Sequence, residues 1–268
     1  MQVPAHKWLE EGEKRTLRVF AISDIHVDFE ENLNWVVNLS ANDYRNDLLI
    51  LAGDVTDSIS MLANVFERLQ KCFLKVLYVP GNHDLWVVRD EKLNSLDKFY
   101  LIKQIAEECG ISTGAAHFGP LSIVPLYGWY DYSFGLPSED LRYQWMDYFS
   151  CKWPSSDGEE SITRFFVALN QDVLDIRNQI IISFSHFLPR IDIMPDFIPP
   201  GGRMIYPVLG TSILEEQIRR LRPHIHYYGH SHFNIRVNRD DITYINNAFG
   251  YPNETRITSK ELICILSL

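Results

Sequence analysis

The chain has 268 residues, a formal net charge of −10 and a sequence pI near 5.3. Hydrophobic residues make up 46% and charged residues 22%, an ordinary balance for a globular protein with a sizeable core. An acidic chain lacks the basic surface that holds nucleic acid by its phosphates, so an anionic substrate would need a local source of positive charge such as a metal ion.

Six short apolar segments have the length and the β-branched or aromatic content of strands. They cover residues 17–23, 47–53, 73–81, 121–126, 179–185 and 224–229. Their apolar residues are continuous rather than alternating, which is typical of strands buried on both faces. Helical patterns cover about 58–71, 95–109 and 213–221. The alternation of strands and helices predicts βαβ units and a largely parallel sheet.

Capping signals support these helices. Asp57 is a candidate N-cap for the first, Gly110 ends the second, and Ser212 with Glu215 has capping-box spacing at the start of the third. The tail, 233–268, lacks helical spacing and is predicted to form a second, antiparallel group of strands.

Residues 127–160 and 187–210 have no clean period, and loops of this length are uncommon without a function. No repeat, low-complexity tract or linker divides the chain, so we expect one domain over residues 1–268.

Acidic, amide or imidazole side chains follow five of the apolar segments directly. The five stretches are SDIH (23–26), GDVTD (53–57), GNHD (81–84), SH (185–186) and GHSH (229–232). Open α/β sheets place their ligand sites at the carboxyl ends of the strands. Each stretch is a weak signal by itself, but the ordered set indicates a shared site.

The residue types in these stretches suit a metal centre. The candidate ligands are Asp24, His26, Asp54, Asn82, His186, His230 and His232. Carboxylate, amide and imidazole donors favour Mn, Fe or Zn over metals that prefer thiolates. The set is too large for one tetrahedral ion and fits two ions that share a carboxylate, a centre that activates water and clamps phosphate.

The ordered motifs resemble those of the calcineurin-like metallophosphoesterases, which follow the series DxH, GDxxD, GNH(D/E), H, GHxH. The resemblance spans residues 23 to 232 and implies a four-layer α/β/β/α sandwich with a dinuclear centre. It assigns one metal to Asp24, His26 and His232, and the other to Asn82, His186 and His230. Asp54 would bridge the two ions.

The resemblance also assigns roles beyond the metals. It implies that His83 donates a proton to the leaving oxygen or stabilises the transition state, with Asp57 orienting it and Asn82 also near the substrate. Asp57 as a simple helix cap is the alternative, and for Asp84 a structural role is at least as good an interpretation as a catalytic one.

Two arginines that grip phosphate in the phosphoprotein phosphatases are replaced here by Ser58 and Pro80. This departure favours the small-molecule and phosphodiester branches. Arg203, and similarly Arg190, are candidates to bind substrate phosphate, or are solvated surface charges. Trp129 and Tyr130, in an aromatic stretch, are candidates to wall the cleft, although packing on the sheet is the simpler interpretation.

We therefore expect a metal-dependent hydrolase of small phosphate esters, a phosphodiesterase or phosphomonoesterase acting on nucleotide-like substrates. The alternatives are an inactive scaffold on the same fold and a metal-dependent nuclease, the latter disfavoured by the acidic pI. The four cysteines are scattered, the first 15 residues are polar, and no apolar run reaches the length of a membrane helix. These features predict a cytoplasmic protein without membrane partners.

Overall fold

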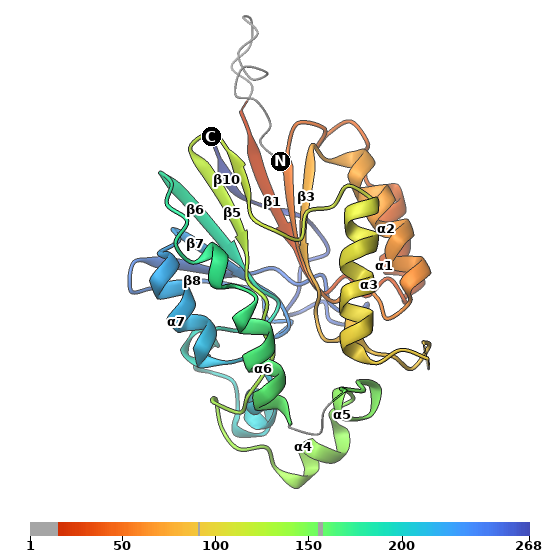
Figure 1. The fold of residues 1–268 in the computed structure, drawn as a ribbon, viewed down its shortest axis with the longest axis vertical. Helices are drawn as coiled ribbons and strands as arrows, with labels where there is room; N and C mark the ends of the chain where they lie inside the picture. Colours follow the sequence, from red (N-terminus) through yellow and green to blue (C-terminus); the bar gives the residue numbers. More distant parts are fainter. Residues whose placement is uncertain (1–15, 91, 155–157) are drawn as a thin grey trace, which may run out of the picture.

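The computed structural model describes residues 16–90, 92–154 and 158–268 (Figure 1). Two β-sheets lie side by side, with helices α1, α2 and α3 outside the first and helices α6 and α7 outside the second. This arrangement confirms the expected four-layer α/β/β/α sandwich. No helix in these described ranges is long and apolar enough to cross a membrane.

The first sheet has the strand order β10-β1-β2-β3. Its strands are β1 Arg18–Ile22, β2 Leu48–Ala52, β3 Lys75–Val79 and β10 Ile263–Ser267. The first three pair in parallel, and β10 pairs antiparallel with β1. All five residues of β2 are buried, as the continuous apolar pattern predicts for a central parallel strand with both faces covered.

The second sheet has the order β4-β5-β6-β7-β9-β8. Its strands are β4 Ala116–Phe118, β5 Leu121–Pro125, β6 Ile180–Phe184, β7 Ile225–Tyr228, β8 Ile235–Arg239 and β9 Ile242–Asn246. The four inner strands are parallel, and the edge strands β4 and β8 are antiparallel to their neighbours.

The tail does not form one antiparallel group, so that prediction was wrong. Strand β9 pairs in parallel with β7, and β10 crosses to the other sheet, where it covers the edge of β1. An uncovered sheet edge leaves backbone donors and acceptors without hydrogen-bond partners, and β10 supplies these partners for β1.

Two helix caps differ from the expectation by one residue. Helix α2, Ile59–Cys72, is capped by Ser58, whose Oγ accepts from the Met61 amide, and not by Asp57. Helix α7, Ser212–Leu221, is capped by Thr211 and not by Ser212. Helix α3, Ser95–Glu108, ends as predicted near Gly110, whose φ of +77° lies in the left-handed region.

Several helices lie where no helical period was visible. They are α1 Glu30–Asn38, α4 Glu139–Gln144, α5 Asp147–Ser150 and α6 Glu159–Ala168. Helices α4 and α5 are very short and belong to the segment expected to be a loop. They lie at the foot of the view in Figure 1, below α3 and α6. Tertiary contacts rather than periodicity stabilise helices of this length.

A buried histidine joins two inner strands of the second sheet. His226 in β7 is fully buried, with ring nitrogens 2.8 Å from Ser183 Oγ and 3.1 Å from Ser185 Oγ. Burial lowers the pKa of His226 to about 3. The residue is therefore neutral in the folded protein throughout the range in which an unfolded histidine gains a proton, near pH 6.5.

This shift predicts a contribution to acid sensitivity. Below about pH 6.5 the unfolded chain binds a proton at His226 that the folded chain refuses, so stability falls as the pH falls towards 3. Relative to His226→Gln, the wild type is expected to lose about 2 kcal/mol of unfolding free energy between pH 7 and pH 5. Urea unfolding of both proteins at the two pH values measures the change in unfolding free energy. An equal change in wild type and variant would contradict the prediction.

Candidate metal centre

The structure brings all seven candidate ligands together at the carboxyl ends of strands from both sheets. Asp24 and His26 follow β1, Asp54 follows β2, Asn82 follows β3, His186 follows β6, and His230 and His232 follow β7. The parallel strands of each sheet have their carboxyl ends at one end of that sheet, and these ends of the two sheets meet at the candidate ligands. The convergence expected from the motif order is therefore present in the fold.

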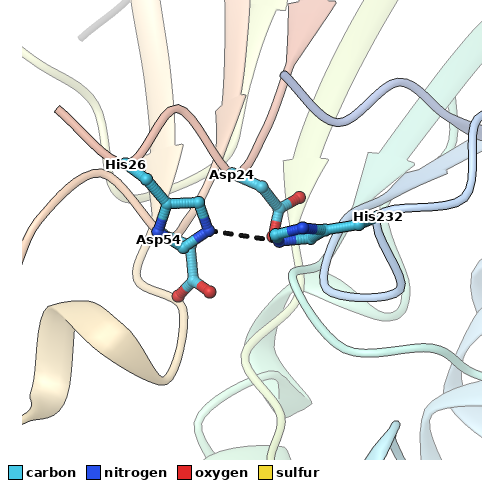
Figure 2. A group of neighbouring side chains, drawn as sticks. All are labelled: Asp24, His26, Asp54 and His232. Atoms are coloured by element: carbon cyan, nitrogen blue, oxygen red, sulfur yellow. Dashed lines mark hydrogen bonds and ion pairs between the residues drawn. The ribbon is translucent and has the colours of Figure 1, made fainter. Parts of the chain in front are cut away.

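The first group of ligands comprises Asp24, His26, Asp54 and His232, shown in Figure 2. One donor atom from each residue lies within 4.8 Å of the others. The Nε2 atoms of His26 and His232 are 3.1 Å apart, and His232 Nε2 is 3.3 Å from Asp24 Oδ1. Each ring thus aims a nitrogen at the common centre.

The second group comprises Asp54, His186 and His230, whose donor atoms also lie within 4.8 Å of one another. His186 Nε2 lies 3.1 Å from both His230 Nδ1 and Asn82 Oδ1. Asp54 belongs to both groups. Lone pairs that face one another at such distances repel unless a cation lies between them, so the donor set fits two metal ions.

Partners outside the groups decide which ring nitrogen is free. His186 Nδ1 lies 2.8 Å from the Ala52 carbonyl oxygen, and His230 Nε2 lies 3.0 Å from that of Val208. A carbonyl only accepts, so these nitrogens carry the hydrogen and donate it, and the opposite nitrogens face the centre as acceptors. Glu254 Oε2, 2.7 Å from His232 Nδ1, does the same for His232.

Burial keeps several of these imidazoles neutral, the form that ligates metal. It lowers the pKa of His26, His186 and His230 below the ordinary value. His232 differs: burial opposes its charge, but Asp24 and Glu254 outweigh burial and raise its pKa to about 9. A proton on His232 and a nearby cation are alternative ways to neutralise these carboxylates.

The carboxylates respond to the same forces. Burial, followed by the charge of Asp24, raises the pKa of Asp54 well above its ordinary value. Burial also disfavours charge on Asp24, but its neighbour His232 reverses the effect and lowers the pKa of Asp24. Two buried carboxylates side by side need positive charge, which again fits metal ions.

Backbone strain accompanies the site. Five candidate ligands have φ between 45° and 67°, in the left-handed region that non-glycine residues seldom occupy: Asp24, His26, Asp54, His230 and His232. Such conformations cost free energy and persist where the surrounding structure enforces them, often at functional sites.

Glycines allow the loops to approach this closely. A Cβ on Gly53 would lie 2.5 Å from the Gly81 nitrogen and 2.7 Å from His186 Nδ1, closer than real Cβ atoms come. A Cβ on Gly229 would lie 2.9 Å from Asp24 Oδ2. Gly53 and Gly229, the first residues of two of the five stretches, are therefore required by packing around the candidate ligands.

The family model of the calcineurin-like phosphoesterases matches residues 17–234. The chain belongs to this family. It is accordingly a metal-dependent phosphoesterase, and the family depends on a dinuclear metal centre.

Two comparisons point to one relative. The chain is 26% identical over 269 residues to the acyl-carrier-protein phosphodiesterase PptH of Mycobacterium tuberculosis, over 89% of this chain and 79% of that protein. The crystal structure of phosphopantetheinyl hydrolase PptH from Mycobacterium tuberculosis has a TM-score of 0.79 at 23% identity, and the match covers 93% of this chain and 96% of that one. The two proteins share a fold.

His83 of this phosphoesterase lies beside the two groups. Its Nε2 is 3.9 Å from Asp54 Oδ2, and its ring stacks on Trp86 with centroids 3.7 Å apart. Burial, followed by the neighbouring His232, lowers the pKa of His83 to about 3. Asp57, predicted to orient His83, instead forms an ion pair with Arg89 at 3.0 Å. Trp86, three residues after His83, is the partner that sequence reasoning missed.

The arginines predicted to bind substrate are engaged elsewhere. Arg203 donates to the carbonyl oxygens of Ile198 and Asp196, at 2.8 and 2.9 Å, and does not line the pocket. Arg190 pairs with the carboxylates of Asp192, Glu215 and Asp240. Arg203 is held within its own loop, whereas Arg190 links its loop to α7 and to the turn between β8 and β9.

Trp129 and Tyr130 are buried and pack with other aromatic rings rather than facing the cleft. The simpler interpretation of that aromatic stretch was therefore right.

A cavity of about 300 Å³ opens above the candidate ligands of the phosphoesterase. Its walls include Trp86, Gln144, Trp145, Met146, Ile205 and Tyr251. Among the described residues that line it, none is a lysine or an arginine, whereas Asp147 and Glu254 add negative charge. The pocket walls therefore supply no lysine or arginine for an anionic substrate.

Asp84 holds the loops that carry two candidate ligands. Its buried carboxylate accepts hydrogen bonds from the backbone amides of Gly81, Asp54, Val55 and Thr56, at 2.8 to 3.0 Å, and from the Tyr78 hydroxyl at 2.8 Å. All its partners belong to the protein framework, which supports a structural role.

Removing this carboxylate is expected to destabilise the fold. Asp84→Ala leaves four buried backbone amides without an acceptor, so we expect a loss of at least about 3 kcal/mol in unfolding free energy. The exposed Asp172→Ala should change it by less than about 0.5 kcal/mol. Chemical denaturation of the three proteins measures this, and equal stability of Asp84→Ala and wild type would refute the role.

Proposed function

We propose that this chain is a dinuclear-metal phosphodiesterase that binds its substrate in the cavity above the candidate ligands. The observation that supports it is the convergence of seven donor side chains in two groups that share Asp54, at the base of a pocket whose described walls hold no lysine or arginine. Bound metal ions would supply the positive charge that holds an anion in such a pocket.

The proposed ligand sets follow the two groups. Asp24, His26 and His232 would hold one ion, Asn82, His186 and His230 the other, and Asp54 would contact both. The mixed carboxylate, amide and imidazole set fits Mn, Fe or Zn. When bound, the metal ions neutralise phosphate charge and activate water.

The remaining chemistry belongs to the protein. The Trp86 ring limits how His83 can tilt, and the His83 backbone amide donates to Asp54 Oδ1 at 2.9 Å. A bound phosphodiester would raise the pKa of His83, because an adjacent negative charge favours the imidazolium. We propose that His83 then gives its proton to the leaving oxygen as the phosphorus–oxygen bond breaks.

The charge of the pocket favours a diester. A phosphomonoester carries about −1.5 to −2 near pH 7, whereas a diester carries one negative charge. With no lysine or arginine on the described walls, the second charge of a monoester would have no partner. The walls offer aromatic rings, the Gln144 amide and the apolar Met146 and Ile205, which suit an uncharged, amide-bearing or flat substituent.

PptH, by its name, acts on the acyl carrier protein. We propose a phosphopantetheinyl diester on a carrier protein as the first substrate to test, with nucleotide-like diesters as the second.

The four cysteines are free, which fits the reducing cytoplasm.

Loss of a shared or terminal ligand should abolish catalysis. Asp54→Asn and His232→Ala are expected to lose hydrolysis of bis(4-nitrophenyl) phosphate, by at least about a thousandfold, together with bound metal. Elemental analysis measures the bound metal, and a colour assay with Mn, Fe, Zn, Co or Ni measures the hydrolysis. His117→Ala, on the exposed edge strand β4, should keep both.

Full activity in a metal-depleted Asp54→Asn protein would contradict the proposal. A wild type that binds metal but hydrolyses no ester would favour the inactive scaffold. Cleavage of single-stranded or duplex DNA on a gel would favour the nuclease.

A diester preference should depend on the uncharged wall. We expect kcat/KM for bis(4-nitrophenyl) phosphate to exceed that for 4-nitrophenyl phosphate by at least about tenfold, and Gln144→Arg to narrow this ratio by giving the second charge a partner. Gln144→Met, similar in size but uncharged, is the matched control. A wild type that prefers the monoester would refute the charge argument.

Mass spectrometry of holo carrier protein, with nucleotide diesters in parallel, then identifies the substrate class.

A further inference from the structure

A buried carboxylate outside the metal motifs contacts the candidate site. Asp147, the first residue of α5, accepts hydrogen bonds on Oδ1 from Asn82 Nδ2 at 2.8 Å and Trp86 Nε1 at 2.6 Å, and on Oδ2 from Trp145 Nε1 at 2.8 Å. Its exposed fraction is 3%. No lysine or arginine forms an ion pair with it in the described chain.

The first contact decides which atom Asn82 presents. The oxygen and nitrogen of an amide have nearly the same shape, so only hydrogen bonds choose between the two orientations. Because a carboxylate only accepts, Asp147 holds the Asn82 nitrogen. The Asn82 oxygen is thereby turned to the opposite side, where it lies 3.1 Å from His186 Nε2. A flipped amide would present NH2 to the cation, which cannot ligate.

The second contact fixes the surface against which His83 lies. Trp86 stacks on His83 with an interplanar angle of 27°, and its indole nitrogen is anchored to Asp147. The third contact of Asp147 anchors Trp145. This residue lines the pocket, and its ring centroid lies 5.8 Å from that of His230. Asp147 therefore joins a candidate ligand, the ring behind His83 and the wall formed by the α4–α5 segment.

We propose that Asp147 is a positioning residue for the metal centre, which holds Asn82 with its oxygen towards the ion shared with His186 and His230. This inference rests on the proposed two-metal function. The α4–α5 segment thus completes the site from outside the motif series.

Asp147→Leu tests the role because it keeps roughly the size and shape of the side chain and removes both acceptor oxygens. Asn82, Trp86 and Trp145 then lose their common acceptor, and the Asn82 nitrogen is no longer held by residue 147. We expect the affinity for one of two Mn²⁺ ions to fall about 10- to 100-fold in calorimetric titration, while the other changes less than about threefold. Asp140→Leu, the same change at an exposed position on α4, should leave both affinities unaltered.

A double-mutant cycle separates positioning from general destabilisation. If Asp147 acts through Asn82, the double variant Asp147→Leu with Asn82→Ala should bind Mn²⁺ no more weakly than Asn82→Ala alone. Two effects that add would overturn the inference. Should Asp147→Leu lose its cooperative thermal transition, Asp147→Ser, which keeps one small acceptor and leaves room for water, takes its place. Loss of folding in both would assign Asp147 to the framework alone and also overturn the inference.

The wild-type titration distinguishes the two levels of failure. Fewer than two bound Mn²⁺ ions in the wild type would defeat the proposed function itself. Two bound ions in the wild type, with unchanged affinities in Asp147→Leu, would defeat only the role of Asp147.

Discussion

Mutual repulsion among buried donor groups is the constraint on which this structure depends. Carboxylates, imidazoles and an amide from five strand ends meet in one place, with most of their atoms out of water. Buried like charges and facing lone pairs are unfavourable unless cations lie between them. The left-handed backbone at five of these residues and the close approach of Gly53 to Gly81 both follow from forcing the donors together.

A second layer of contacts gives the donors their direction. The Ala52 and Val208 carbonyls and the Glu254 carboxylate each accept from one ring nitrogen, which turns the other inward. Asp147 does the equivalent for the amide of Asn82. Asp84 does not reach the donors; it ties together the backbone of the loops that carry them. Orientation and support therefore come from different residues.

Charge is distributed so that the metal ions would dominate the pocket. The chain is acidic, and two of its arginines are paired: Arg89 with Asp28 and Asp57, and Arg190 with three carboxylates. Their fields are largely cancelled by these partners. An anionic ester would therefore be attracted mainly by bound cations, and its other substituent would contact aromatic, amide and apolar walls. This division suits a singly charged diester.

The sequence by itself determined six of the strands, their largely parallel pairing and the set of candidate ligands. Continuous apolar runs indicate burial on two faces, and polar residues at strand ends indicate a shared edge. Tertiary structure alone decided which partners meet across long separations. Asp147 lies 65 residues from Asn82, β10 covers β1 from the far end of the chain, and Arg89 takes the carboxylate expected to serve His83. Periodicity and spacing indicate whether a side chain is buried. They do not indicate which distant group that side chain will contact, because this depends on how the two sheets and the short α4–α5 segment pack.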